Sequence, residues 1–396
     1  MKRYWITAAV VALVMLAGFW LARPLWQNMP FKGVLKVGFL FEHDESTPYT
    51  YNFSLAEDAL ALQYGERVQV LTRSNVLRDE TGDALVELVR RGCGIIFVCT
   101  DSDQPARIAA EHPQVQFCQL ATPAALPQER PRNYHTFNAK MWQARYLSGV
   151  AAGMRLQELL EAGRITEDQA LVGFVASSLT PGNLSGAAAY LLGARSVAPQ
   201  ALLKVAVTGA WCSYTQDKAA AAALIDAGCL VITANTHTTG TAVACEAAAV
   251  AGKPVAVIGY SRSTLDIAPT ATLLSVRVNW APYITGAVGA LLDGKAIEAA
   301  VQADAHGTDL CAGLDQGWVQ LMEINPLAAA AGTGDALSRL SESLRRGSLE
   351  VFRGPYTATD PANPQDTIDL RNGFTENRDS SIPSFHYLLD GLAEVI

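Results

Sequence analysis

From residue 34 onward, short β-rich apolar runs alternate with longer segments whose apolar residues follow helical spacing. Strands are expected at residues 34–41, 68–72, 94–99 and 115–120, with helices between them at residues 55–63, 83–91 and 105–111. Such alternation predicts the α/β class, in which parallel sheets carry helices on both faces.

The pattern restarts after residues 121–132, a linker rich in proline and alanine. The string VGF at residues 37–39 recurs at 172–174, and GCGII at 92–96 returns as GCLVI at 228–232, so each string recurs 135 or 136 residues later. Both pairs of strings occupy the same place in the order of elements. The chain is therefore expected to contain two similar Rossmann-like lobes.

The later elements are expected to return the chain to each lobe in turn. They are strands at 134–138, 254–260, 272–278 and 318–323, and helices at 139–160 and 283–292. Residues 31–133 plus about 254–300 are assigned to the first lobe, and residues 134–253 plus about 301–330 to the second. Residues 331–396 are expected to form an extension packed on the lobes, with a helix at 335–345, then mostly loop, and a final docking helix at 385–395.

The N-terminus has the pattern of an export signal. Lys2 and Arg3 precede an uncharged apolar stretch at residues 5–22. About 18 apolar residues also reach the length of a helix that spans a bilayer. Residues 1–30 are thus predicted to be either a signal peptide or an anchor in the inner membrane, with the rest of the chain periplasmic. Phe19 stands where lipidation would need a cysteine.

Composition and motifs narrow the function. The chain has a net charge of −8 and no cluster of Lys or Arg, which argues against nucleic acid as a partner. Seven cysteines form no CxxC pair, and no two of the six histidines have metal-ligand spacing, so no metal or cofactor is expected. The sequence also lacks the common nucleophile, zinc-protease and phosphate-loop motifs. A non-catalytic binding protein is expected.

The candidate ligand residues are aromatic and hydrogen-bonding side chains that follow the predicted strands, because parallel sheets bind ligands beyond their strand ends. Together they suit a flat heteroaromatic ring, which stacks on aromatics and presents polar edges. Any one of them, taken alone, is explained equally well as a helix cap or a surface residue. They are Tyr49, Thr50, Tyr51, Asp101, Asp103, Asn138, Trp211, Asn235, His237, Tyr260, Ser261, Arg262 and Trp280.

Several strings resemble one known family. These strings are RYLSGV at 145–150, GARSV at 193–197, ALIDAG at 223–228, VNWAPY at 278–283 and VFRGP at 351–355. In this order they resemble the basic membrane protein family of ABC-transporter solute-binding proteins, of the purine nucleoside receptor type. The resemblance implies a type I periplasmic binding fold with a ligand clamped between two lobes. It also implies an ABC permease and ATPase as partners.

The resemblance implies roles for some candidates. Tyr49 stands where the family has a base-stacking Trp, Trp211 corresponds to a second stacking aromatic, and either Asp103 or Asp101 reads the base edge. Ser261 and Ser213 replace carboxylates of nucleoside-binding members, and a lysine is missing near Val276. A purine-type nucleobase is therefore expected in preference to a nucleoside. The alternative is a membrane-tethered sensor of the same fold that acts on a signalling partner.

Overall fold

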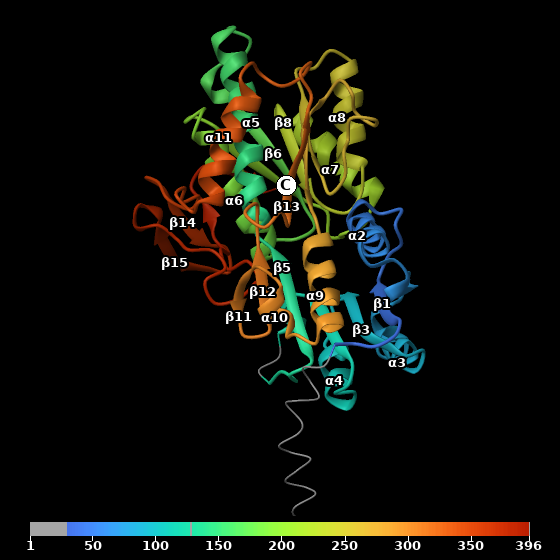
Figure 1. Cartoon of the computed structure of the whole chain (residues 1–396). Coiled ribbons are helices and arrows are strands. Elements are labelled where there is room, and N and C mark those ends of the chain that lie inside the picture. The colour runs from blue at the N-terminus through green and yellow to red at the C-terminus, as the bar shows by residue number, and fades with distance from the viewer. Residues whose placement is uncertain (1–29, 127–128, 396) are drawn as a thin grey trace, which may run out of the picture.

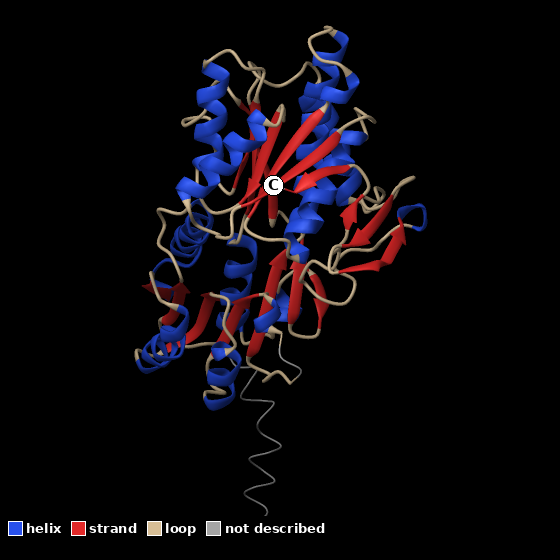
Figure 2. Cartoon of the chain, turned by 180° about the vertical axis from the view of Figure 1, so that it is seen from behind, coloured by secondary structure: helices blue, strands red, loops and turns tan. Residues whose placement is uncertain are grey.

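The computed structural model describes residues 30–126 and 129–395, and the apolar segment at residues 5–22 lies outside this part. Two seven-stranded sheets, each flanked by helices, form two lobes that lie one above the other in Figure 1. Figure 2 shows the two sheets from behind. Within the described residues, no helix has both the length and the apolar character to cross a membrane.

The first lobe has the sheet order β11-β12-β5-β4-β3-β1-β2. Its strands are β1 (Leu35–Phe41), β2 (Val68–Arg73), β3 (Cys93–Cys99), β4 (Gln116–Leu120), β5 (Tyr134–Ala139), β11 (Asp304–His306) and β12 (Asp309–Ala312). Its helices are α2 (Pro48–Tyr64), α3 (Thr81–Arg90), α4 (Gln104–Glu111), α9 (Ala281–Asp293) and α10 (Ile297–Ala300).

The second lobe has the sheet order β13-β10-β9-β8-β6-β7-β17. Its strands are β6 (Leu171–Ala176), β7 (Leu202–Val207), β8 (Val231–Asn235), β9 (Ala256–Tyr260), β10 (Thr272–Val278), β13 (Val319–Ile324) and β17 (Leu392–Val395). Its helices are α5 (Met141–Glu161), α6 (Pro181–Arg195), α7 (Tyr214–Asp226) and α8 (Gly240–Val250).

The repeat found in the sequence is visible in the packing. The five parallel strands run 2-1-3-4-5 in the first lobe and 7-6-8-9-10 in the second. A Cβ placed on Gly38 would lie 3.1 Å from Ile96 and 3.2 Å from Cys93. A Cβ on Gly173 would meet Ile232 and Cys229, which stand at the corresponding places of the second lobe, at 3.0 and 3.3 Å. The short strings thus mark the same crowded contact between the first strand and its neighbour, and the expectation of two similar α/β lobes is confirmed.

Three chain segments cross between the lobes: β5 to α5, β10 to α9, and β12 to β13. Strand pairing differs here from the expected lobe boundaries. β5 pairs with β4 in the first sheet, whereas β9 and β10 extend the second sheet from β8. β12 pairs with β5 and so keeps residues 309–312 in the first lobe. The boundaries differ because a strand belongs to the sheet that bonds its backbone, and this pairing leaves no local mark in the sequence.

The C-terminal extension differs from the expected loop and docking helix. After α11 (Thr333–Arg345), three short strands form a separate sheet, in the order β15-β14-β16. They are β14 (Thr357–Asp360), β15 (Asn363–Asp369) and β16 (Leu388–Leu389). The chain then ends in β17, which pairs in parallel with β7, so the expected helix at 385–395 is wrong. An edge strand offers unpaired backbone groups, and β17 covers those of β7.

Helix α2 begins at Pro48, seven residues before the expected start at residue 55. Thr47 has an extended backbone and its side chain accepts a hydrogen bond from the Thr50 backbone N–H, while Pro48 occupies the first helical position. These capping signals outweigh the low helix propensity of the aromatic run that follows. Tyr49, Thr50 and Tyr51 consequently lie on the first turn of a helix at the lobe interface, and not in a loop.

Candidate functional site

Three aromatic rings form a stack between the lobes. Tyr49 comes from α2 of the first lobe, whereas His237 and Trp211 follow β8 and β7 of the second. The Tyr49 and His237 rings are 4.4 Å apart and almost parallel, at 12°, and the Trp211 ring lies 5.3 Å from His237 at 30°. The His237 backbone N–H donates to the Trp211 carbonyl at 2.7 Å, which holds the two loops of the second lobe together. The stack therefore joins both lobes through aromatic faces.

Burial sets the protonation of two of these rings. It lowers the pKa of His237 to about 3, so the imidazole between the two rings is neutral at physiological pH. Burial also raises the pKa of the Tyr49 hydroxyl well above its ordinary value. The stack is consequently uncharged, and Trp211, with 44% of its surface exposed, forms its outer end.

A polar contact joins the lobes beside the stack. The Asn52 side chain donates from Nδ2 to the Ser261 carbonyl at 2.8 Å, across 209 residues of sequence. Ser261 has a φ of 64°, a left-handed conformation that is uncommon for a residue with a side chain. The Oδ1 of Asn52 and the Oγ of Ser261 are both buried and have no hydrogen-bond partner in the described part of the chain. A buried acceptor and a buried hydroxyl left without partners are groups that a ligand edge could satisfy.

A buried arginine organises the second lobe beneath this contact. Arg145 on α5 is 1% exposed and donates to Thr233 Oγ1 at 2.9 Å and to Asn235 Oδ1 at 2.9 Å. Its guanidinium lies 4.3 Å from the centre of the Tyr260 ring. Burial lowers the pKa of Arg145 to about 10, which leaves the side chain charged at physiological pH. Arg145 thus fixes the orientation of Asn235 and Tyr260.

Asn235 is also held from its other side. Its Nδ2 donates to Asn183 Oδ1 at 2.6 Å, and Asn183 in turn donates to the Ser178 carbonyl at 2.8 Å. Arg145 and Asn183 were not among the candidates from the sequence, and Asn52 was considered only as part of the segment after the first strand that supplied Tyr49, Thr50 and Tyr51. The string RYLSGV, which begins at Arg145 and belongs to the family resemblance, was the sequence signal that could have indicated Arg145.

The structure brings seven candidates together at the lobe interface or directly behind it. They are Tyr49, Tyr51, Trp211, Asn235, His237, Tyr260 and Ser261. Arg262 belongs to the rim of the same region, because its guanidinium lies 5.3 Å from the centre of the Tyr51 ring and its side chain is exposed.

The other candidates have different surroundings. Asp101 is exposed and pairs with Arg78 at 3.5 Å, and Asp103 is exposed just before α4. Asn138 accepts a hydrogen bond from the backbone N–H of Ala139 at 2.8 Å. Trp280 has no exposed surface.

Trp280 and Thr50 have partners within the protein, although the buried Nε1 of Trp280 has no hydrogen-bond partner in the described part of the chain. Trp280 stacks on Phe53 at 5.4 Å and meets the edge of Phe137, which is the environment of a core side chain. Thr50 accepts a hydrogen bond from the Thr47 hydroxyl at 3.0 Å. It faces a polar groove that also contains Glu57 and Thr72, on the side of α2 that faces β2.

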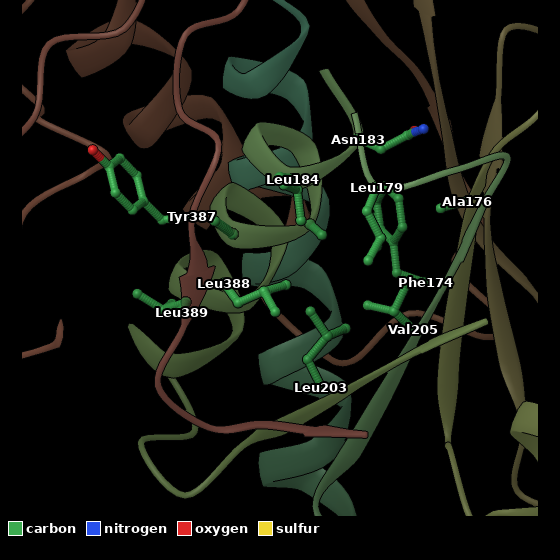
Figure 3. A pocket seen from close by; sticks show the side chains of 12 residues that line it. Phe174, Ala176, Leu179, Asn183, Leu184, Leu203, Val205, Tyr387, Leu388 and Leu389 are labelled. Atoms are coloured by element: carbon green, nitrogen blue, oxygen red, sulfur yellow. The ribbon is translucent and has the colours of Figure 1, made fainter. Parts of the chain in front are cut away.

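A small cavity lies elsewhere, between the second lobe and the C-terminal extension. Phe174, Leu184 and Leu203 line it from the lobe, and Leu388 and Leu389 close it from the extension (Figure 3). It has an apolar lining and room for about one water molecule. It is therefore a small gap in the packing between the second lobe and the extension.

Comparisons with known proteins agree with this architecture. Residues 68–331 match the family described as ABC transporter substrate-binding protein PnrA-like. A purine-binding protein of Brucella abortus (strain 2308) is 25% identical over 334 residues, which cover 82% of this chain and 85% of that protein. A Haloferax volcanii protein named for glucose binding, TsgA13, is 27% identical over 252 residues, 64% of this chain and 57% of that protein.

Solved structures show the same fold. A solute-binding protein of an ABC transporter system from Aeropyrum pernix K1 superposes with a TM-score of 0.64. The superposition covers 79% of this chain and 92% of that one, at 16% sequence identity. At this identity the likeness concerns the arrangement of the two lobes and says nothing about the ligand.

Proposed function

Because this chain belongs to the PnrA-like family of ABC transporter substrate-binding proteins, we propose that it is the receptor of an importer and that it clamps a purine-type ring between its lobes. The stack of Tyr49, His237 and Trp211 carries this proposal. Flat uncharged faces from both lobes meet there, and a flat heterocycle gains the same stacking energy that the rings give each other. The purine-binding relative from Brucella abortus supports this ligand class.

His237 occupies the space between the other two rings. An imidazole and a purine share a flat aromatic face, so the ligand ring takes the place of the imidazole between Tyr49 and Trp211, and His237 moves aside. Contacts from both lobes to one ligand then favour the closed arrangement, which a permease and its ATPase recognise. The substrate-binding proteins of this family act outside the cytoplasm, where such a receptor meets its solute.

The polar groups beside the stack favour a base over a nucleoside. Asn52 Oδ1 accepts hydrogen bonds only, and Ser261 Oγ both donates and accepts, as the edge of a purine requires. Ser261 stands where nucleoside-binding members are expected to hold the ribose with a carboxylate. Without that carboxylate, the ribose hydroxyls lose their strongest partner.

Calorimetric titration of the purified protein tests the ligand class. Adenine, guanine, xanthine and urate are compared with the corresponding nucleosides and with glucose. We expect a nucleobase to bind more tightly than its nucleoside, and glucose not to bind. Tighter binding of the nucleosides would refute the preference for a base, and binding of glucose alone would refute the purine.

Two variants test the stacking. Tyr49→Ala and Trp211→Ala are each expected to weaken binding of the base by roughly 1–3 kcal/mol, since each removes one aromatic face. Tyr214→Ala is the matched control, because Tyr214 is a nearby aromatic residue, 46% exposed, outside the stack. Unchanged affinity in both test variants would show that the ligand lies elsewhere.

A further inference from the structure

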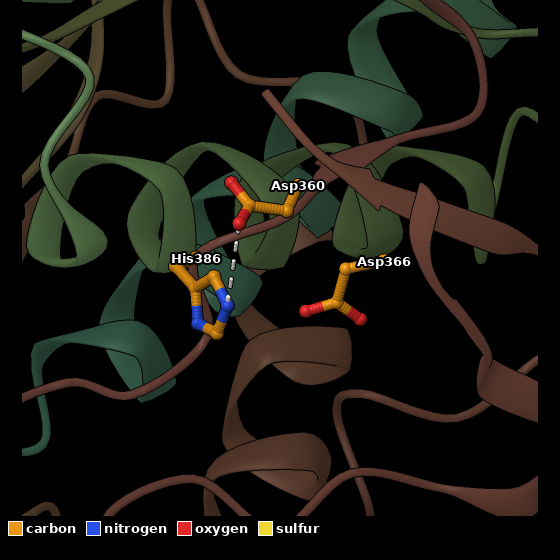
Figure 4. A group of neighbouring side chains, drawn as sticks. All are labelled: Asp360, Asp366 and His386. Carbon is orange, nitrogen blue, oxygen red and sulfur yellow. Dashed lines mark ion pairs between the residues drawn. The ribbon is translucent and has the colours of Figure 1, made fainter. Parts of the chain in front are cut away.

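The three-stranded sheet of the extension brings together three side chains with metal-binding atoms. Asp360 ends β14, Asp366 lies in β15, and His386 precedes β16 (Figure 4). One ligand atom from each of them lies within 4.8 Å of the other two. We propose that these three residues bind a divalent transition-metal ion, of which Zn²⁺ fits best. The spacing of these residues in the sequence does not predict a metal site, because the three residues become neighbours only through the pairing of β14 with β15 and β16.

The histidine is oriented as a metal ligand. Its Nδ1 donates to the Ser384 carbonyl at 2.8 Å, so the neutral ring carries its lone pair on Nε2. Nε2 lies 4.0 Å from a carboxylate oxygen of Asp360. The ring also stacks on Tyr387 at 4.2 Å. Metal-binding histidines commonly have this arrangement, in which the second ring nitrogen donates to a carbonyl outside the metal site and fixes the ring.

The two carboxylates lack a compensating cation. Across residues 30–126 and 129–395, no Lys or Arg forms an ion pair with Asp360 or Asp366. Both oxygens of Asp366 are 3.5 Å from the Tyr387 hydroxyl, which is long for a hydrogen bond of this type. A divalent ion would neutralise both carboxylates.

The donor set favours zinc over calcium or magnesium. One imidazole nitrogen and two carboxylate oxygens suit Zn²⁺, with water in a fourth position, whereas Ca²⁺ and Mg²⁺ prefer oxygen ligands alone. In a tetrahedral site with bonds of about 2.1 Å, the ligand atoms are about 3.4 Å apart. From separations of up to 4.8 Å, the ligand atoms therefore need to approach one another by up to about 1.4 Å, which a small rotation of partly exposed side chains can supply.

The expected role is structural. The ion would join the β14–β15 hairpin to the segment that leads into β16 and then β17. It would thereby hold the strand that covers the edge of the second lobe.

Metal titration of the full chain tests the site. The exposed thiol of Cys212 is first removed by Cys212→Ser, and the protein is freed of metal with a chelator. We expect one Zn²⁺ per chain by calorimetry, an absorption band from bound Co²⁺, and a higher Tm with Zn²⁺ but not with Ca²⁺ or Mg²⁺. His386→Ala and Asp366→Asn should each weaken Zn²⁺ binding at least tenfold and abolish the rise in Tm.

His112→Ala is the control, because it removes a histidine at the end of α4, far along the chain from this sheet. It should bind Zn²⁺ like the parent. The proposal is overturned if Zn²⁺ leaves the Tm unchanged, if His386→Ala binds Zn²⁺ as tightly as the parent does, or if Ca²⁺ stabilises equally. The experiment is independent of the purine proposal, since neither the aromatic stack nor the contact between Asn52 and Ser261 is changed.

Discussion

At the scale of the residue, His237 is the side chain whose position has the clearest consequence. Its imidazole lies between Tyr49 and Trp211 and is neutral because it is buried. A ligand that enters this stack must first displace the imidazole and lose its stacking energy. That cost lowers the apparent affinity for the ligand relative to the intrinsic affinity of the open site.

The variant His237→Ala tests this competition. Removal of the imidazole frees the space between the two rings, so the purine base should bind more tightly, by about fivefold if the lost ring contact is worth about 1 kcal/mol. Calorimetric titration measures the change. Weaker binding in the variant would instead show that His237 contacts the ligand directly.

Glu57 gives a prediction on pH. Burial raises its pKa from 4.5 to about 7, although its carboxylate accepts a hydrogen bond from the Thr72 hydroxyl. Between these two pH values the folded chain keeps a proton that the unfolded chain has lost, so this residue makes the fold less stable as the pH rises. Glu57→Gln removes this effect and can still accept from Thr72.

Thermal melts of Glu57→Gln across pH should show the difference. At pH 8 the variant is expected to have a higher Tm than the parent, and at pH 4.5 the two values should converge. Glu66→Gln, an exposed change nearby, should show no such trend. If the difference in Tm between Glu57→Gln and the parent stayed constant with pH, the raised pKa of Glu57 would be contradicted.

At the scale of the element, the pair α5 and α6 has the tightest contact. A Cβ on Gly149 would lie 2.0 Å from the Tyr190 carbonyl oxygen, and one on Gly193 would lie 2.0 Å from that of Tyr146. Both obstacles are backbone atoms, which cannot rotate away as side chains can. Because α5 also holds Arg145, this close approach places the guanidinium under the lobe interface.

Gly149→Ala should force the two helices apart. The expected cost is about 1–3 kcal/mol of unfolding free energy, which exceeds the gain in helix propensity of about 1 kcal/mol. Chemical denaturation measures it. Gly186→Ala on α6 is the control, because its nearest neighbour would be 3.5 Å away, and its stability should stay equal or rise. Equal stability of Gly149→Ala and the parent would show that the helices are not so close.

At the scale of the whole molecule, the C-terminal extension connects to both lobes. Asp309 of the first lobe accepts a hydrogen bond from the Ser381 backbone N–H at 2.8 Å. Glu376 of the extension accepts from Ser185 of the second lobe at 2.7 Å and from the backbone N–H of Phe385 at 2.9 Å. Two buried carboxylates thus fasten one segment of the extension to both lobes.

Glu376→Gln should loosen that segment. The neutral amide replaces charge-assisted hydrogen bonds from Ser185, Ser384 and Phe385 with weaker neutral ones, and its NH2 group forces the Ser185 hydroxyl to accept instead of donate, at a cost of roughly 1–3 kcal/mol. Limited proteolysis should then cut the extension faster than in the parent or in Glu111→Gln, an exposed change on α4. The same digestion rate in all three proteins would contradict this role.

The local pattern of the sequence determined the α/β class, the two lobes and most of the elements, because helix and strand periodicity and capping act over a few residues. It also indicated Tyr49, Trp211 and His237, since polar and aromatic residues after parallel strands gather at one edge of the sheet. The resemblance to the solute-binding family added the fold type; the family match confirmed the family, and the likeness to solved structures confirmed the fold.

Only the tertiary structure decided which residues face each other. The contact of Asn52 with Ser261 spans 209 residues, and the support of Asn235 by Arg145 spans 90. The sheet that receives β9 and β10, and the meeting of Asp360 with His386, also follow from backbone pairing between distant strands. Such pairing is chosen by the energy of the whole packed chain, and no short stretch of sequence contains it.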